Sequence, residues 1–538
     1  MSTATMPRSE IRDGRLFIDG QRALLVGGEL HNSSASTPAE IRRSFEKMRD
    51  LGADTVLAPI CWEQFEPAEG AFDTALIDEM IAAGHELSLR VIPLWFGAWK
   101  NAMSMYAPSW VKLDTERFPR AVAGERAVEH VSVFGEALLE VESRTFRTFA
   151  EHIVSADPHG VIPLLQIENE IGLLGAARDT SPLAETAYRR AVPADVIEAV
   201  AAASHAPIHA EWQAHGARTE GSWAELFGES ETTSEAFMAT AFARHVQRLA
   251  VIARETIGIP TFVNAWLDSE KKPEETVGPA LAGGMRPGIY PSGGPVLRVA
   301  PIWRALAPAL DFLSPDIYHG VFDDICRGYR EQAGTLFIPE MRRRGRGIGQ
   351  MFRAVGEHGA IGVSPFGVDS FAADADETSL YVDALGQLRA VGESLRQHPE
   401  ARTRGFGLKE DDGVQTFVFG EYELTVDTRS LALPTEQDAA SGHGVIVEEA
   451  PGVFLIAGRG FRLSTRAVNG RECGILSAIE LEPGSGHEVR RHMNGDETGS
   501  GASTWFPELP ERAYLHPALP FPAMTGRTGI ARITLYTF

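Results

Sequence analysis

Two carboxylates flank an asparagine directly after an apolar run in the first half of the chain. Residues 161–165 are apolar, and residues 166–172 then read Gln-Ile-Glu-Asn-Glu-Ile-Gly. If this segment is a strand, Glu168 and Glu170 project to one side and Asn169 to the other, unless the strand bends at its end. A further acid, Glu340, follows the apolar residues 335–339. One such acid is as often a solvated strand-end residue, but two of them favour catalysis.

A pair of acids at strand ends is what a retaining glycosidase uses, one as proton donor and one as nucleophile. Glu170 and Glu340 fit these two tasks if their surroundings separate their pKa values. Glu168 competes with Glu170 because it shares the motif. Asn169 favours Glu170 as the proton donor, since its amide can bond a sugar hydroxyl beside that acid.

Aromatic and polar side chains follow the other expected strands. Aromatic rings cover the apolar faces of sugars, although each ring alone is more often part of the core. The aromatic candidates are Trp62, Trp95, Phe96, Trp99, Trp266, Tyr318 and Phe366. The polar candidates are Glu29, His31, Glu63, Glu66, Lys100, Asn101, Asn264 and Asp316. We expect a sugar pocket built from members of both sets.

Other chemistries have weaker support in the sequence. His31 has no second histidine at ligand spacing, so we expect no metal and no cofactor. The glycine pairs at 27–28 and 283–284 lack the context of a phosphate-binding loop. The arginines at 342–344 follow Glu340 closely, and one of them could keep it ionised, although a solvated basic turn is the simpler interpretation.

Strand-like runs alternate with amphipathic segments through the first 400 residues, which predicts a parallel α/β fold. Eight runs are candidates, the number that a (β/α)₈ barrel requires. They are residues 23–30, 55–60, 89–96, 161–167, 261–266, 312–318, 335–339 and 360–365. The chemistry of such a barrel lies at the carboxyl ends of its strands, where the candidate acids are found.

The sequence predicts two domains. Residues 1–400 are expected to form the catalytic barrel, with an insertion at about 182–228 that either shapes the pocket or is decorative. Residues 401–538 contain short β-rich runs separated by Gly, Pro and Asp, which predict an antiparallel sandwich or open barrel. We expect this domain to contribute structure more than chemistry, with carbohydrate binding as the alternative.

Bulk composition excludes several partners. A net charge of −23 over 538 residues argues against nucleic acid or an anionic membrane surface as a partner. We expect no membrane span and no signal peptide. The three cysteines, Cys61, Cys326 and Cys473, show no metal spacing and suit a reducing cytoplasm. A homo-oligomer is compatible with the sequence.

Three motifs resemble glycoside hydrolase family 35, the β-galactosidases of a large retaining (β/α)₈ clan. Residues 27–31 read Gly-Gly-Glu-Leu-His, residues 62–70 read Trp-Glu-Gln-Phe-Glu-Pro-Ala-Glu-Gly, and residues 166–172 carry the acid motif. The resemblance covers most of the first 400 residues. It implies that Glu170 is the acid/base, that Asn169 holds the sugar 2-hydroxyl and that Glu340 is the nucleophile.

The chain departs from the family at two places. Pro59 stands where the family usually has a tyrosine, and residues 98–101 read Ala-Trp-Lys-Asn where an Ala-Glu pair is usual. Lys100 and Asn101 are therefore expected to donate to sugar hydroxyls, with Trp99 as a wall; alternatively, Lys100 pairs with Glu63 or Glu66. These features also resemble a bacterial subgroup with an uncharacterised C-terminal β-domain.

The sequence thus predicts a cytoplasmic, exo-acting, retaining β-galactosidase whose substrate is an oligosaccharide or glycoside. The alternatives are a retaining glycosidase for another sugar, such as an arabinoside, and a non-catalytic carbohydrate-binding barrel.

Overall fold

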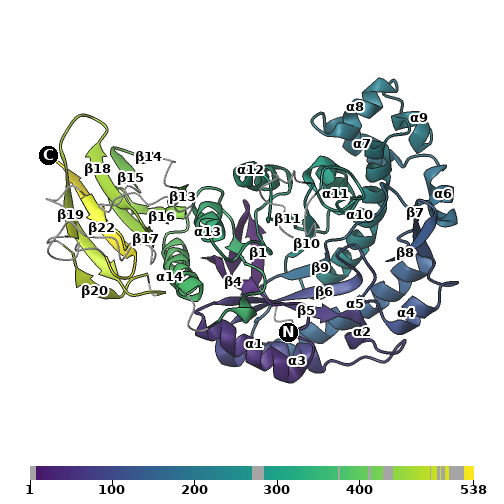
Figure 1. Ribbon diagram of the computed structural model, residues 1–538, viewed down its shortest axis with the longest axis horizontal. Helices are drawn as coiled ribbons and strands as arrows, with labels where there is room; N and C mark the ends of the chain where they lie inside the picture. Colours follow the sequence, from purple (N-terminus) through teal and green to yellow (C-terminus); the bar gives the residue numbers. More distant parts are fainter. Residues whose placement is uncertain are drawn as a thin grey trace, which may run out of the picture. The chain divides into compact units, whose positions relative to one another are not determined.

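A seven-stranded sheet, surrounded by helices, forms the centre of the first part of the protein in the computed structural model (Figure 1). The structure describes residues 8–268, 284–372, 376–409, 414–427, 440–484, 486–493, 497–498, 503–507 and 526–538. The strand order in the sheet is β11-β10-β9-β6-β5-β4-β12, and the pairs with a defined register are parallel.

The strands of this sheet are made of buried residues, as a sheet covered on both faces requires. Every residue of β5 is buried, and β6 is buried after its first residue. The bounds are β4 (Leu25–Glu29), β5 (Thr55–Cys61), β6 (Arg90–Lys100), β9 (Leu165–Asn169), β10 (Thr261–Trp266), β11 (Phe312–Asp316) and β12 (Gly362–Val363). These strands confirm the expected barrel-like α/β fold.

One expected strand differs. The sequence predicts a strand at residues 335–339, but only Ile338 forms a bridge there, and the segment is not part of the described sheet. Glu340 therefore follows a segment that is not joined to the sheet by a continuous row of backbone hydrogen bonds. Its backbone carbonyl is fixed instead by a hydrogen bond from the Ile317 N–H, 2.9 Å long, just after β11.

Helices alternate with these strands. They are α1 (Pro38–Asp50), α2 (Trp62–Phe65), α3 (Ala75–Leu87), α4 (Ser109–Leu113), α5 (Glu136–Ala156), α10 (Glu231–Thr256), α11 (Ala300–Leu306), α12 (Phe322–Gln332), α13 (Arg346–Gly356) and α14 (Asp376–Gln397). Two short 3-10 turns are η2 (Leu297–Val299) and η3 (Val368–Ser370). Helix α10 begins at a serine cap, because Ser230 accepts a hydrogen bond from the Thr233 N–H. No helix in the described ranges is long and apolar enough to cross a membrane.

The segment expected to be an insertion, residues 182–228, folds as four short helices. They are α6 (Pro182–Tyr188), α7 (Ala194–Ala202), α8 (Pro207–Ala214) and α9 (Trp223–Phe227). Helix α9 starts with a reciprocal capping box between Ser222 and Glu225. Two small antiparallel sheets complete this part: β1 (Ser9–Arg12), β2 (Arg15–Ile18) and β3 (Gln21–Ala23), and the hairpin β7 (Arg120–Ala123) and β8 (Arg126–Val131).

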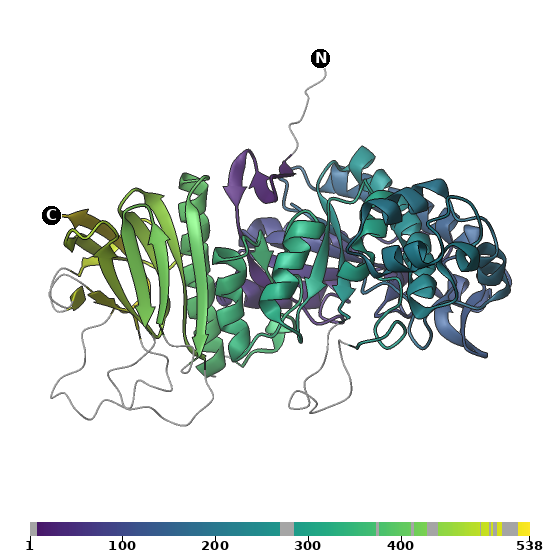
Figure 2. The ribbon, with the colours of Figure 1, turned by 90° about the horizontal axis from the view of Figure 1, so that it is seen from above.

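The C-terminal part is rich in antiparallel strands, as predicted (Figure 2). A six-stranded sheet has the order β13-β16-β17-β22-β19-β20, and a four-stranded sheet has the order β14-β15-β18-β21. The bounds are β13 (Arg402–Lys409), β14 (Val414–Phe419), β15 (Tyr422–Asp427), β16 (Ala440–Ala450), β17 (Val453–Arg459), β18 (Arg462–Ala467), β19 (Cys473–Leu481), β20 (Val489–His492), β21 (Ser503–Trp505) and β22 (Ile530–Thr537).

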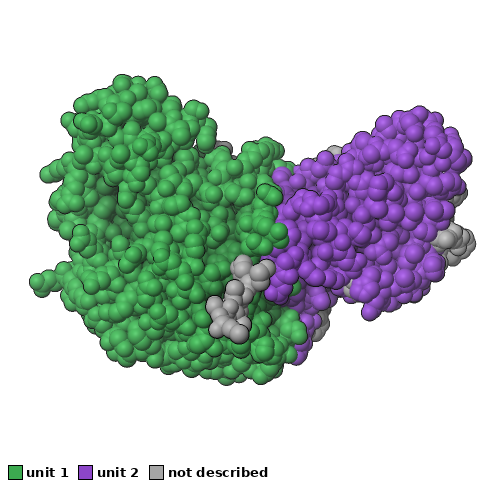
Figure 3. Space-filling view, turned by 180° about the vertical axis from the view of Figure 1, so that it is seen from behind, with its two compact units in different colours: residues 1–14, 29–47, 55–340 green, residues 15–28, 48–54, 341–538 purple. Residues whose placement is uncertain are grey.

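Residues from both sheets share one hydrophobic core. Phe406, Leu424, Phe454 and Ile533 are among its buried members. Helix α13 packs on β13 and β16, and glycine makes this possible, because a Cβ on Gly356 would lie 2.6 Å from the Cα of Gly405 on β13. The chain divides into two compact units (Figure 3), one with residues 1–14, 29–47 and 55–340 and the other with residues 15–28, 48–54 and 341–538.

Candidate active site

Three buried carboxylates from different segments of the chain meet within the first unit. Glu170 follows β9, Asp316 ends β11, and Glu340 follows residues 335–339. One oxygen from each lies within 4.8 Å of the others. The predicted pair, Glu170 and Glu340, is therefore brought together, with Asp316 as the third member.

The backbone at the end of β9 separates the two glutamates of the motif. Glu168 and Glu170 both adopt left-handed backbone geometry, with φ values of 58° and 45°. Non-glycine residues rarely adopt this geometry, and it turns the strand out of regular alternation. Glu170 consequently joins Glu340, while Glu168 contacts β6. The two side chains therefore lie in different sites. The sequence predicts that they project to one side unless the strand bends at its end, and the strand does bend there.

Asn264, on β10, holds Glu170 in this conformation. Its Oδ1 accepts a hydrogen bond of 2.9 Å from the Glu170 N–H, and its Nδ2 donates to Asp316 over 2.8 Å. Both polar ends of the amide are thus used within the protein. Asn264 belongs to the predicted site, and these two hydrogen bonds give it a role in positioning the acids.

The surroundings raise the pKa values of Glu170 and Asp316. Burial raises the pKa of Glu170 to about 8, helped by the charge of Glu340, while Lys100 and a hydrogen bond with Asp316 oppose the shift. Burial, followed by the charges of Glu340 and Glu170, raises the pKa of Asp316 well above its ordinary value. Glu170 is thus held as a neutral carboxylic acid at pH 7.

Glu340 has a defined partner on one oxygen only. Tyr318 donates a hydrogen bond of 2.9 Å to Oε2, while Oε1 has no hydrogen-bond partner in the part of the chain that is described. Of the nearby arginines, Arg343 donates to the Gly367 carbonyl and to Ser370, and its guanidinium lies 4.7 Å from the centre of the Phe371 ring. These contacts fit a structural role for Arg343.

Glu168 belongs to a different cluster, with Glu142 on α5 and His245 on α10. Its carboxyl group accepts hydrogen bonds from the N–H groups of Ala98, 3.1 Å, and Trp99, 2.8 Å. Nε2 of His245 lies 2.7 Å from Glu142 Oε2. Sequence reasoning did not find Glu142 or His245; the available signal was a polar residue on the apolar side of each helix.

The surroundings shift the pKa values of the two acids of this cluster in opposite directions. Burial and the neighbouring Glu142 raise the pKa of Glu168 well above its ordinary value. Burial also acts to raise the pKa of Glu142, but the hydrogen bond and charge of His245 outweigh it, so that this pKa lies below its ordinary value. Glu168 shapes the end of β6 through its hydrogen bonds from the N–H groups of Ala98 and Trp99.

Two acidic clusters in the described ranges have the spacing to hold a metal ion: Glu142, Glu168 and His245, and Glu170, Asp316 and Glu340. In the first, His245 and backbone N–H groups occupy the oxygens. In the second, Tyr318 and Asn264 occupy two of them. Hydrogen bonds therefore account for part of each cluster without a metal.

Lys100 lies at the end of β6, buried and 5.0 Å from the centre of the Phe96 ring. No ion pair within 4 Å forms between Lys100 and any residue in the described segments. The proposed alternative partners are engaged elsewhere, because Glu63 pairs with Lys112 at 3.3 Å and Glu66 with Arg144 at 2.9 Å.

Asn101 continues the chain in left-handed geometry, with a φ of 51°. Its N–H donates to the Asn169 carbonyl over 3.2 Å, which ties the ends of β6 and β9 together. The Oδ1 of Asn101 and both amide atoms of Asn169 are buried without a hydrogen-bond partner among the described residues. These groups can therefore accept and donate to a bound molecule.

Two predicted sugar contacts are corrected. Glu66 is fully buried and accepts from Trp62 Nε1, the Gly70 N–H, Arg144 and Thr145, so both its oxygens are used to join α2 to α5. The Trp99 ring is fully buried, 5.4 Å from His130 and 5.3 Å from Phe242 between ring centres. It is a core side chain and not a wall of a sugar site.

The remaining predicted residues are placed as follows. Glu29 ends β4 in the interior, Trp266 ends β10 with its Nε1 unpartnered within the described part of the chain, and His31 is half-buried. Trp62, Trp95 and Phe96 are fully buried and belong to the core. Glu29 and Trp266 thus remain available to a ligand.

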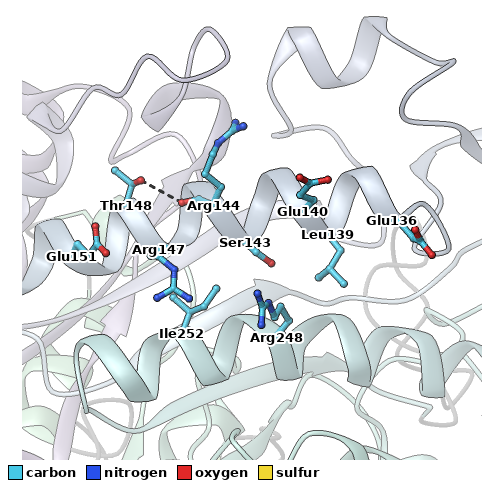
Figure 4. A pocket seen from close by; sticks show the side chains of 10 residues that line it. All are labelled: Glu136, Leu139, Glu140, Ser143, Arg144, Arg147, Thr148, Glu151, Arg248 and Ile252. Atoms are coloured by element: carbon cyan, nitrogen blue, oxygen red, sulfur yellow. Dashed lines mark hydrogen bonds between the residues drawn. The ribbon is translucent and has the colours of Figure 1, made fainter.

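A separate hollow of about 580 Å³ lies between α5 and α10 (Figure 4). Arg144, Arg147 and Arg248 line it together with Glu136, Glu140 and Glu151. Its lining includes none of Glu170, Asp316 and Glu340, so it is distinct from the candidate active site.

Residues 15–273 match the model of Glycosyl hydrolases family 35, and residues 383–504 match a domain of unknown function, DUF5597. The first match includes Glu170 but ends before Asp316 and Glu340. The first match covers all three motifs and confirms their resemblance to this family, and the second confirms the expected uncharacterised C-terminal domain. No curated protein sequence matches the chain.

Several solved structures are similar. A β-galactosidase from the psychrophilic Marinomonas ef1 has 14% identity and a TM-score of 0.45, over 69% of this chain and 60% of its own. A β-galactosidase from Bacillus circulans sp. alkalophilus has 12% identity and a TM-score of 0.48, over 71% of this chain and 57% of its own. The exo-β-1,4-mannosidase Op5Man5 from Opitutaceae bacterium strain TAV5 has 16% identity and a TM-score of 0.38, over 66% and 54%. The chain spans less than two thirds of the length of each.

Proposed function

We infer that this chain, a glycoside hydrolase acting on a carbohydrate substrate, is a retaining exo-β-glycosidase that releases terminal β-D-galactosyl residues. The observation that carries the proposal is the approach of Glu170 and Glu340, whose nearest carboxylate oxygens lie within 4.8 Å. Retaining glycosidases keep their two carboxyl groups about 5 Å apart, whereas inverting enzymes separate them by about 6.5–9.5 Å to admit a water.

In the first step Glu340 attacks the anomeric carbon while Glu170 gives its proton to the leaving oxygen. The glycosidic C–O bond breaks and a glycosyl ester of Glu340 forms. In the second step the Glu170 carboxylate takes a proton from water, the water oxygen bonds to the anomeric carbon, and Glu340 leaves. Two inversions return the sugar to its original configuration.

The site supports this division of labour. The proton donor must be neutral near pH 7, and a pKa of about 8 provides that state in Glu170. Tyr318 orients Glu340 through Oε2 and leaves Oε1 unbonded within the described protein. Asn169 can hold the sugar 2-hydroxyl, as the resemblance implies, since both of its amide atoms lack a partner in the described protein.

The galactosyl specificity rests on the family match and on the motifs. Another β-glycoside, such as an arabinoside, is the alternative within the same mechanism. A non-catalytic binding barrel fits less well, because sugar binding does not require three buried carboxyl groups whose charges repel one another.

Further features support a cytoplasmic enzyme and a structural C-terminal region. The three cysteines form no disulfide with one another, and Cys61 and Cys326 are buried, which suits a reducing compartment. The sandwich has its own hydrophobic core. We propose that residues 401–538 form a separate domain that stabilises the protein, and that the barrel occupies residues 1–400.

The test is to assay the purified protein on a panel of 4-nitrophenyl β-glycosides and to follow the first product by proton NMR. We expect β-galactoside to be the best substrate and the β-anomer of the sugar to appear first. Initial release of the α-anomer would refute retention, and preference for another glycone would refute the galactosyl assignment.

A further inference from the structure

Glu29 is a buried acid that nothing in the described protein engages. It is the last residue of β4, it is 1% exposed, and neither carboxyl oxygen has a hydrogen-bond partner in the segments that the structure describes. Buried polar groups in proteins are nearly always hydrogen-bonded, because leaving one unbonded is unfavourable. A buried carboxyl group with two unbonded oxygens therefore indicates a bound partner.

Glu29 ends β4 at the carboxyl edge of the parallel sheet, where Asp316 ends β11 and Glu170 follows β9. Burial raises the pKa of Glu29 well above the ordinary value, and the charges of Glu340 and Glu170 add to the shift while Lys100 opposes it. Glu29 and Lys100 end two different strands, β4 and β6. They therefore offer an acceptor and a donor at the edge of the proposed glycone site.

The two groups complement a sugar hydroxyl, which both donates and accepts. Lys100 has no ion pair within 4 Å in the described chain, so its three N–H donors are available. The carboxyl group of Glu29 can accept from one hydroxyl or from two neighbouring ones. Unbonded groups of Asn169 and Trp266 add further contacts of the same kind.

We propose that Glu29 and Lys100 together read hydroxyl groups of the glycone and restrict the substrate to neutral sugars. This inference rests on the proposed function and deepens it. An acidic sugar is disfavoured because its carboxylate would enter the same buried surroundings, beside the charge of Glu340, that disfavour ionisation of Glu29, Glu170 and Asp316.

The test combines site variants with substrates that lack single hydroxyls. The 4-nitrophenyl β-galactoside and its 3-, 4- and 6-deoxy analogues are assayed with the wild type, Glu29→Gln, Lys100→Met and the control Glu63→Gln. Glu63 is the matched control because it is a glutamate of α2, directly after β5, and is paired with Lys112. Thermal unfolding is measured for every protein.

We expect Glu29→Gln to lower kcat/KM on the parent substrate on the order of 10²-fold, because the glycone hydroxyl loses the carboxyl group that accepts its hydrogen bond. On the analogue that lacks the contacted hydroxyl, the same substitution should change kcat/KM by less than about threefold, since the interaction is already absent. The Glu63→Gln control should behave as wild type on every substrate. An equal loss on the parent and all analogues would overturn the proposal.

Two further measurements keep the outcomes separate. Calorimetric binding of galactose to the wild type and to Glu29→Asp tests recognition without catalysis, and Glu29→Asp also serves if the glutamine variant does not fold. The wild type could bind galactose without hydrolysing any glycoside, and Glu29→Asp could bind galactose more weakly. This result would refute the proposed function and support the role of Glu29 in recognition. A wild-type preference for 4-nitrophenyl β-galacturonide, removed by Lys100→Met, would overturn the inference while retaining the glycosidase.

Discussion

Asn264 accepts a hydrogen bond of 2.9 Å from the backbone N–H of Glu170. The same amide donates to Asp316 over 2.8 Å, so one side chain fixes both the proton donor and the neighbouring Asp316. The position of the acid thus depends on a residue 94 positions away in sequence.

Asn264→Ala should lower kcat roughly 10²-fold with a small change in KM, because misplacing a catalytic group by about 1 Å has an effect of that size. Steady-state kinetics on an aryl galactoside would measure it. The Gln64→Ala variant, which removes a hydrogen bond to the Ser36 carbonyl outside the acid cluster, is the control. A change confined to KM would show that Asn264 contacts substrate instead.

Glu170→Gln should abolish proton donation and slow substrates with poor leaving groups by about 10²–10⁴-fold, while 2,4-dinitrophenyl galactoside is affected much less. Glu168→Gln should lower the melting temperature and reduce all substrates by a similar factor, because Glu168 holds the Ala98 and Trp99 N–H groups. Comparing kcat/KM across a leaving-group series separates the two roles. Leaving-group dependence in the Glu168 variant alone would reverse the assignment.

The pH profile should report the raised pKa of Glu170. Since the donor must be protonated, kcat/KM should fall as pH rises through about 8. The stability follows the same direction. The folded state keeps the proton between the ordinary value of 4.5 and about 8, whereas the unfolded state releases it, so this contribution is full below 4.5 and is lost as pH rises through about 8.

Glu170→Gln removes that titration. The wild type loses the stabilising contribution of Glu170 as the pH rises, and the variant does not. The melting temperature of the variant minus that of the wild type should therefore increase when the pH is raised from about 5 to about 9. Differential scanning calorimetry at several pH values measures the difference. A constant difference across this range would contradict a neutral Glu170 in the folded protein.

Glu340→Gly should abolish hydrolysis, and added azide should restore turnover of an activated substrate to give the α-glycosyl azide. Azide then occupies the space of the nucleophile and inverts the anomeric carbon once. The Glu170→Gly variant, as a matched control, should give the β-glycosyl azide through two inversions. NMR of the isolated azides decides, and the same anomer from both variants would refute the two roles.

Phe406→Ala should destabilise the C-terminal sandwich by about 3–5 kcal/mol, the usual effect of truncating a buried phenylalanine. If this region is structural, kcat/KM measured at low temperature should remain close to wild type. Chemical denaturation followed by tryptophan fluorescence and circular dichroism gives the free energy of unfolding. A loss of kcat/KM without a loss of stability would assign the region a part in substrate binding.

The sequence is most informative where burial and position coincide. Strands β5 and β9 are buried throughout, and the acids that follow such strands lie at one edge of a parallel sheet, so the amino-acid pattern alone places Glu170, Asp316 and Glu340 among the candidates for one site. The same pattern cannot separate Glu168 from Glu170, because their directions depend on left-handed backbone geometry set by distant contacts.

The failures have a common physical cause. Trp99 and Glu66 have the residue types and strand-end positions of sugar ligands, yet their partners on α5, α10 and β8 turn them inward. The sequence does not predict Glu142 and His245 as a pair, because the hydrogen bond between them joins residues that are 103 positions apart on two different helices. Residues 335–339 have the composition of a strand, but sheet hydrogen bonds also depend on the neighbouring chain, which composition does not describe.

The left-handed residues on either side of Asn169 also limit how the protein can be engineered. Such geometry costs roughly 1–3 kcal/mol for each non-glycine residue, so the end of β9 keeps a conformation that local preferences oppose. Glycine at position 168 would relieve this strain, but it would also delete the carboxyl group that holds β6. A programme of thermostabilisation should therefore leave residues 166–172 unchanged and look for gains in the helices and in the C-terminal sandwich.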